Sequence, residues 1–139
     1  TSPSEDAILH FCNSIDFDIL VFIQPTSPLL TNKDLDQGID LLLNHQANFD
    51  SIFSVYKEHW IPRWNLNIKP IDWNPKERPR RQDIKENYVE NGAFYISFKK
   101  NILKSKLRYS GKIGCIEMPL YRSFQIDTYD DLELIKKLL

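Results

Sequence analysis

Cysteine, methionine and glycine are scarce in this sequence of 139 residues, and long apolar runs are missing. The two cysteines, Cys12 and Cys115, form no Cys-x-x-Cys pair and have no neighbours with the spacing of a zinc site. This scarcity argues against a disulfide framework and favours a reduced, cytoplasmic location. The longest apolar run, Ile19 to Ile23, is far shorter than the ~20 residues that a membrane-spanning helix needs. We therefore expect a soluble protein without membrane contact.

An excess of charge of either sign is also missing. The chain has 18 Lys and Arg residues against 19 Asp and Glu residues, which gives a net charge of -1. Such a balance creates no overall field to hold a nucleic acid or an anionic membrane, so any site for a polyanion must be local. A hydrophobic content of 42% in a chain of this length suits one globular core rather than two.

The order of the apolar segments predicts an α/β fold. Ser4 can cap a short first helix. The nearly continuous apolar run from Asp18 to Gln24 is typical of a strand that is covered on both faces in a parallel sheet. Thr31 and Asp34 then begin a second helix, and residues 51–56 form the next strand. Strand, helix and strand in this order indicate a right-handed crossover unit.

The second half of the chain is less regular. Residues 57–91 are rich in Trp, Pro and Arg, and they form a connection too long for an ordinary loop in a compact domain. Such a segment is typically functional or bound to a partner. The expected later elements are strands or extended segments at 92–98, 113–118 and 124–126, a short helix near Ile102 and a last helix capped by Thr128.

A polar loop follows the first predicted strand. Gln24-Pro25-Thr26-Ser27-Pro28 stands at the strand's carboxyl end, where open α/β sheets receive their ligands. The Gln24 amide could bind sugar hydroxyls there. A simple turn, in which Gln24 ends the strand and the prolines fix the backbone, explains the same residues.

A basic segment lies within residues 57–91. It comprises Lys76, Arg78, Arg80 and Arg81 with Gln82, close behind Trp60, Trp64 and Trp73. Guanidinium groups suit phosphate or carboxylate oxygens, because their planar donors can engage two oxygens at once. Basic residues between aromatic ones also suit single-stranded nucleic acid, although the balanced net charge disfavours that partner. A solvated surface loop is the third explanation.

Two further motifs stand at the starts of predicted elements, one before the last helix and one before the strand at 92–98. Asp127, in Gln125-Ile126-Asp127-Thr128, could hold magnesium against the phosphates of a nucleotide, or it could simply cap the last helix. Asn91-Gly92 predicts a tight turn into a strand that aims Tyr95 at one face.

The order and separation of these motifs resemble the acylneuraminate cytidylyltransferase family, the CMP-sialic acid synthetases. The resemblance covers essentially the whole chain. It is carried by the segments Ser2 to Ala7, Phe22 to Leu29, Asp50 to Val55, Asn74 to Asp83, Glu90 to Tyr95 and Ser123 to Thr128.

The resemblance implies a fold and a function. Enzymes of this family transfer CMP from CTP to a nonulosonic acid such as a sialic acid and release pyrophosphate. Their Rossmann-like nucleotidyltransferase sheet carries helices on both faces. By the same resemblance, residues 1–139 form one domain in which residues 57–91 are an insertion for dimerisation that caps the sugar site of the partner. The expected partners are CTP, an acidic nine-carbon sugar and a second copy of the chain, with magnesium as the cofactor.

The resemblance also implies roles for single residues. Arg80 and Asp127 would be catalytic, and Asp127 would carry the metal. Ser2 and Ser4 would touch the nucleotide. The expected sugar-binding residues are Gln24, Arg81, Gln82, Asn91 and Tyr95.

The sequence departs from the family pattern in two places. The family's first strand and its phosphate-binding loop have no counterpart here, so we expect the C-terminal portion of such an enzyme, with little or no binding of CTP. Gln125 stands where the family commonly has Asp, and an amide attracts a divalent cation less than a carboxylate does. Two alternatives stay open: a non-catalytic binding or assembly module, and a cytidylyltransferase for another acidic sugar such as Kdo.

Overall fold

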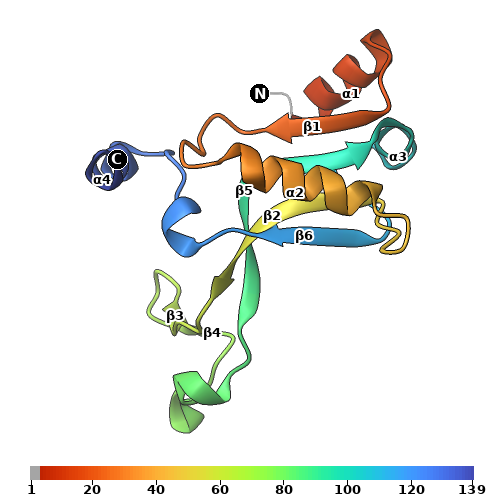
Figure 1. Ribbon diagram of the computed structural model, residues 1–139. Coiled ribbons are helices and arrows are strands. Elements are labelled where there is room, and N and C mark those ends of the chain that lie inside the picture. The colour runs from red at the N-terminus through yellow and green to blue at the C-terminus, as the bar shows by residue number, and fades with distance from the viewer. Residues whose placement is uncertain (1–3) are drawn as a thin grey trace.

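The computed structural model describes residues 4–139 as a mixed four-stranded sheet with helices packed against it and a small separate hairpin (Figure 1). The order of the strands in the large sheet is β1-β5-β2-β6. The strands are β1 (Ile19–Ile23), β2 (Ser51–Glu58), β3 (Arg63–Trp64), β4 (Pro70–Ile71), β5 (Asn87–Phe98) and β6 (Ile113–Glu117). The helices are α1 (Ser4–Ser14), α2 (Asn32–Leu43), α3 (Lys99–Ser105) and α4 (Tyr129–Leu138), with 3-10 turns at Pro75–Glu77, Arg81–Asp83 and Leu120–Arg122. The predicted α/β class is confirmed.

The predicted parallel pairing of the first strand is wrong. β5 lies between β1 and β2 and is antiparallel to both, and the parallel pair of the sheet is β2 with β6. The apolar run in β1 has another cause, because Ile19 and Val21 face the core formed with α2, whereas Leu20 and Phe22 face α1 and α3. Helices therefore cover both faces of β1, although it is an edge strand of the described sheet.

The main core lies between α2 and the middle of the sheet. Ile52 of β2 and Phe94 and Ile96 of β5 are completely buried there. Burial of each such side chain contributes roughly 1.5–3 kcal/mol. No helix among residues 4–139 has the length and apolar character needed to cross a bilayer.

Several local predictions need correction. Residues 124–126 do not form a strand; they have no regular secondary structure, and the Ile126 amide donates to the Thr26 carbonyl at 2.8 Å. Asn91-Gly92 is not a turn ahead of a strand but lies inside β5, which begins at Asn87. Ser4 is the first residue of α1 rather than the residue before the helix. The predicted starts of α2 after Thr31 and of α4 after Thr128 are confirmed, each with a capping box.

The segment between β2 and β5 forms a lobe that projects from the body of the protein (Figure 1). Its three tryptophans pack on one another, with ring centroids 5.0 Å apart for Trp64 and Trp73 and 6.1 Å apart for Trp60 and Trp73. Trp73 also donates from Nε1 to the Arg63 carbonyl at 2.9 Å. These rings form the aromatic cluster of the lobe, although Trp64 is still 47% exposed, and Leu66 and Ile68 at the hairpin are 102% and 74% exposed.

Asp34 ties the start of α2 to the C-terminal part of the chain. Its carboxylate accepts hydrogen bonds from the amide and hydroxyl of Thr31 at 3.0 and 2.6 Å, and from Arg122 Nη2 at 2.9 Å. Burial raises the pKa of Asp34, but the hydrogen bonds from Arg122 and Thr31 outweigh burial and hold the pKa below its ordinary value. The pair fixes the Leu120–Arg122 turn beside the loop that follows β1.

We predict that Asp34→Asn destabilises the protein by about 3 kcal/mol, because it leaves the half-buried Arg122 without its counter-charge. Since the folded pKa of Asp34 is depressed, its contribution is present above the unfolded pKa of about 3.9 and is lost as pH falls through the folded pKa. Urea unfolding at pH 7 and near pH 3 should therefore show a difference between variant and wild type that shrinks at the lower pH. The exposed pair Lys136–Glu133 provides the control, and Glu133→Gln should change stability by less than about 0.5 kcal/mol.

Candidate functional site

The candidate site is built on a bulge in β5. Phe53 pairs with Tyr95 and Val55 pairs with Glu90, so residues 91–94 of β5 stand opposite Ser54 alone. The buried Ser54 hydroxyl accepts from the Phe94 amide at 3.1 Å and donates to the Phe94 carbonyl at 3.4 Å. One side chain thus satisfies backbone groups for which the sheet ladder has no partner.

The buried side chain of Asn91 stabilises the bulge through hydrogen bonds. Its side chain is 5% exposed, and its Oδ1 accepts from the Ala93 amide at 3.2 Å. Its Nδ2 donates to Ser123 Oγ at 3.0 Å and contacts Met118 Sδ at 3.4 Å. Because these protein groups occupy both ends of the amide, Asn91 shapes the site rather than offering it a free polar group.

Gly92 brings two glutamine side chains together. Its φ of +68° lies in the left-handed region, and a Cβ there would clash with the Gln125 amide and lie 2.7 Å from Gln24 Oε1. Gln125 Nε2 donates to the Asn91 carbonyl, and the Gln24 backbone amide donates to the Ala93 carbonyl at 3.1 Å. The bulge therefore joins the end of β1 to the segment that follows β6.

An open cleft of about 380 Å³ lies over this bulge. Its lining residues are Gln24, Tyr56, Val89, Glu90, Asn91, Gly92, Tyr95, Ser123 and Gln125. The cleft stands at the carboxyl end of β1, the edge at which open α/β sheets bind ligands. Amides, hydroxyls and one carboxylate make up its polar groups, with no Lys or Arg among the lining residues, which suits a ligand rich in hydroxyl groups.

Tyr95 forms a fixed wall of this cleft. Its ring is 5% exposed, and its hydroxyl donates to Glu90 Oε1. Burial and the Glu90 carboxylate raise the pKa of Tyr95 far above its ordinary value. The phenol therefore stays protonated at neutral pH and keeps its bond to Glu90.

The structure brings together some of the residues predicted from sequence and separates others. Gln24, Asn91 and Tyr95 line the same cleft. Arg80, Arg81 and Gln82 lie in the lobe and do not line it; the nearest carboxylate to Arg80 Nε is Asp83 Oδ2, at 3.9 Å. Within one chain, these residues are therefore not among those that line the cleft with Gln24.

Two other predicted residues, Asp127 and Ser4, are not among the residues that line the cleft. Asp127 is exposed, two residues beyond Gln125, and does not line the cleft. Ser4 lies in the first turn of α1. Ser2 lies outside the described residues.

Four residues at or near the site were not predicted from the sequence. Tyr56, Glu90 and Ser123 line the cleft, and Ser27 Oγ is the buried side-chain oxygen or nitrogen that lacks a hydrogen-bond partner within residues 4–139. Glu90 and Ser123 stand in motifs that had been singled out, so the motifs were an available signal. Tyr56 had no such signal, because its place depends on the register of β2 against the bulge.

The fit of a divalent cation depends on Asp127. The described part of the chain contains no group of three or more His, Cys, Asp or Glu residues that could hold a metal ion. Asp131 is committed to capping, since its Oδ2 accepts from the Thr128 amide and hydroxyl, each at 2.8 Å. One free carboxylate at Asp127 fits magnesium only if phosphate oxygens and water supply the other ligands, which is the usual arrangement for this ion.

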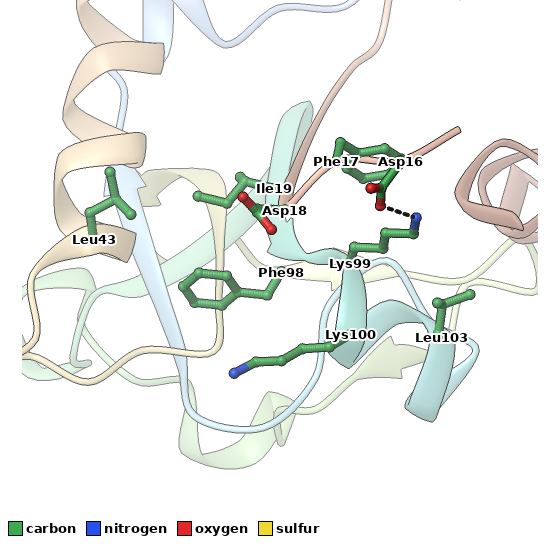
Figure 2. A pocket seen from close by; sticks show the side chains of 9 residues that line it. All are labelled: Asp16, Phe17, Asp18, Ile19, Leu43, Phe98, Lys99, Lys100 and Leu103. Carbon is green, nitrogen blue, oxygen red and sulfur yellow. Dashed lines mark hydrogen bonds and ion pairs between the residues drawn. The ribbon is translucent and has the colours of Figure 1, made fainter. Parts of the chain in front are cut away.

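A larger hollow of about 590 Å³ lies at the other end of β1 (Figure 2). Its charged lining residues are Asp16, Asp18, Lys99 and Lys100. The Lys99 ammonium is held by Asp16 at 3.4 Å and by the Ile15 carbonyl at 2.8 Å. Lys100 lies over the Phe98 ring, 5.4 Å from its centroid. Because this hollow lies at the amino end of the strand and Lys99 is paired internally, it is a poorer candidate than the cleft over the bulge.

Comparison with known proteins identifies relatives along almost the whole chain. N-acylneuraminate cytidylyltransferase A of Danio rerio is 35% identical over 135 residues, covering 91% of this chain and 30% of that protein. N-acylneuraminate cytidylyltransferase of Oncorhynchus mykiss is 32% identical over 135 residues, with the same coverage of 91% and 30%. The chain is a homologue of the N-acylneuraminate cytidylyltransferases. This confirms the resemblance drawn from its motifs.

The family relationship extends to a second type of enzyme. Pseudaminic acid cytidylyltransferase of Campylobacter jejuni strain 81-176 is 28% identical over 134 residues, covering 93% of this chain and 56% of that protein. The chain thus spans about 30% of the length of the two N-acylneuraminate relatives and about 56% of this one. No family model matches the chain.

A solved structure supports the fold independently. The 4-diphosphocytidyl-2C-methyl-D-erythritolsynthase from Anaerococcus prevotii superposes with a TM-score of 0.67 over 99% of this chain and 64% of that one. The sequence identity is 12%, so this similarity establishes a shared fold alone.

We predict that Gly92→Ala lowers the free energy of unfolding by about 1–2 kcal/mol, because an L-residue must adopt a left-handed conformation there. It should also shift the NMR signals of the Gln24 and Gln125 side-chain amides. Gly111→Ala is the matched control, since Gly111 has a φ of +71° and contacts Asp50 outside the cleft. That variant should be similarly destabilised and leave both glutamine signals in place; equal shifts in the two variants would contradict the role given to Gly92.

Proposed function

We propose that this chain is the sugar-binding part of a cytidylyltransferase that transfers CMP from CTP to a nonulosonic acid and releases pyrophosphate. The observation that carries the proposal is the cleft over the bulge. Gln24 is far in sequence from Asn91 and Tyr95, and all three line it. The homology to N-acylneuraminate and pseudaminic acid cytidylyltransferases supports the same substrate class.

The lining of the cleft suits the hydroxyl-bearing part of such a sugar. The Gln24 amide would bind hydroxyl groups, and the Tyr95–Glu90 pair would form the wall beside them. The carboxylate of the sugar must lie elsewhere, because Glu90 would repel it and the lining residues include no cation.

We propose that the lobe of a second copy supplies the missing positive charge. Arg80 has a side chain that is 77% exposed, and Arg81 and Gln82 follow it in the same turn. The exposed Leu66 and Ile68 of the lobe offer apolar surface for such a contact. A homodimer would then place Arg80, Arg81 and Gln82 over the partner's cleft.

Charge neutralisation and positioning would carry the reaction. Attack of the sugar's anomeric hydroxyl on the α-phosphorus of CTP breaks the bond to pyrophosphate, and such transfers require cationic donors around the phosphates. Arg80 would be the catalytic cation, and Ser4, with Ser2 before it, would touch the nucleotide. Asp127 would hold magnesium, which when bound supplies further positive charge at the phosphates.

Calorimetric titration of the chain with N-acetylneuraminic, legionaminic and pseudaminic acids tests the sugar-binding role. Gln24→Leu should weaken the affinity for the preferred sugar about 10-fold, the usual effect of losing one hydrogen bond of about 1.4 kcal/mol. Gln46→Leu makes the same chemical change at an exposed position outside the cleft and should leave the affinity unchanged. Failure of the wild type to bind any of these sugars, or an equal loss in both variants, would refute the proposal. Release of pyrophosphate from CTP in the presence of magnesium and the bound sugar would show that the chain acts as an enzyme and not as a binding module alone.

Sedimentation velocity tests the role of the lobe. We predict that Leu66→Lys raises the dissociation constant of the dimer at least about 10-fold, because a charge replaces apolar contact area at the interface. Leu139 is 87% exposed and directly follows α4, outside the lobe, so Leu139→Lys should leave the dimer intact. A wild type that stays monomeric at high concentration would contradict the dimer proposal.

A further inference from the structure

We propose that Arg108 is a positioning residue that holds Tyr95 of the cleft and the first turn of α1 in one fixed arrangement. The inference rests on the proposed function, since it links the sugar side of the site to the segment expected to contact the nucleotide. Arg108 belongs to the connection between α3 and β6 and does not line the cleft itself.

The guanidinium of Arg108 lies against two aromatic rings. Its Cζ is 5.0 Å from the centroid of the Tyr95 ring and 5.6 Å from that of Phe22. Tyr109, the next residue, stacks on Tyr95 with centroids 5.9 Å apart and an interplanar angle of 14°. The Arg108 backbone is anchored in turn, because its carbonyl accepts from Ser97 Oγ at 2.6 Å. Two adjacent side chains therefore fix the Tyr95 ring.

The charge of Arg108 is balanced by α1. Its Nε donates to Glu5 Oε1 at 2.6 Å, and the two side chains are 16% and 28% exposed. The hydrogen bond from Arg108 lowers the pKa of Glu5, so this carboxylate is ionised at neutral pH. A cation with so little exposure keeps its position only while its counter-charge stays in place.

The contacts form one connected series. Glu5 follows Ser4 in the first turn of α1, Glu5 binds Arg108, and Arg108 lies on the Tyr95 ring, whose hydroxyl binds Glu90 in the cleft. Loss of the Glu5 carboxylate should therefore release Arg108 and, through it, Tyr95. An ion pair that served stability alone would leave the Tyr95 ring where it is.

A double-mutant cycle with Glu5→Gln and Arg108→Met tests this inference. The readouts are the ring signals of Tyr95 in tyrosine-labelled protein, assigned with Tyr95→Phe, and the dissociation constant for the sugar that the wild type binds. We expect each single variant to shift the Tyr95 ring signals and to weaken sugar binding roughly 3- to 10-fold. The double variant should be no worse than Arg108→Met, because residues that act through one contact are not additive. Arg108→Lys retains the positive charge. Its Tyr95 ring signals and its sugar affinity should therefore lie closer to those of the wild type than the values for Arg108→Met do.

Lys99→Met is the matched control. Lys99 also lies over an aromatic ring, 5.0 Å from the centroid of Phe17, and pairs with the Asp16 carboxylate at 3.4 Å. Its removal should leave the Tyr95 signals and the sugar affinity unchanged.

The outcomes separate the two proposals. Unshifted Tyr95 signals in Glu5→Gln, or additive effects in the cycle, would overturn the role of Arg108, even if the melting temperature fell. Absence of sugar binding in the wild type would refute the proposed function instead, and the Tyr95 signals would still decide the role of Arg108.

Discussion

The candidate site depends on the pairing of one buried hydroxyl with a strand that carries extra residues. The Ser54 hydroxyl forms hydrogen bonds with the backbone amide and the backbone carbonyl of Phe94. Residues 91–94 can therefore bulge from β5 while these two buried backbone groups keep a partner. The bulge turns Asn91 inward and leaves space above Gly92 for the amides of Gln24 and Gln125. Without the bulge, a regular β5 would carry its side chains in simple alternation, and these groups would not meet.

Two ion pairs of low exposure hold the surroundings of the bulge. Arg122 and Asp34 fix the turn before Ser123 and Gln125 against the start of α2. Arg108 and Glu5 fix the first turn of α1 against the other side of Tyr95. Both pairs join segments that are far apart in the chain, and ion pairs with so little exposure tolerate little displacement because separation leaves a charge uncompensated. A ligand cleft benefits from such rigidity, since its polar groups are then placed before the ligand arrives.

The charge of the cleft also explains why the lobe matters to the proposed function. A cleft lined by amides, hydroxyls and Glu90 can bind hydroxyl groups but has no cation for an acidic sugar. In the proposed dimer, the exposed arginines of the residues 57–91 segment would provide that complement from a second copy, because within one chain they do not line the cleft. The proposed homodimer thus follows from charge complementarity as well as from the apolar surface at Leu66 and Ile68.

Local chemistry in the sequence determined where α2 and α4 begin. The Thr31–Asp34 and Thr128–Asp131 motifs begin helices as predicted, because a capping box uses only neighbouring residues. The motifs around Gln24, Asn91 and Tyr95 also marked the cleft before its geometry was known. The tertiary structure alone decided that β5 lies between β1 and β2, that Asn91-Gly92 lies in a bulge, that Tyr56 lines the cleft and that Arg108 lies against the Tyr95 ring behind it. These features depend on strand register and on contacts between distant residues, and neither is encoded in the spacing of apolar and polar residues along one segment.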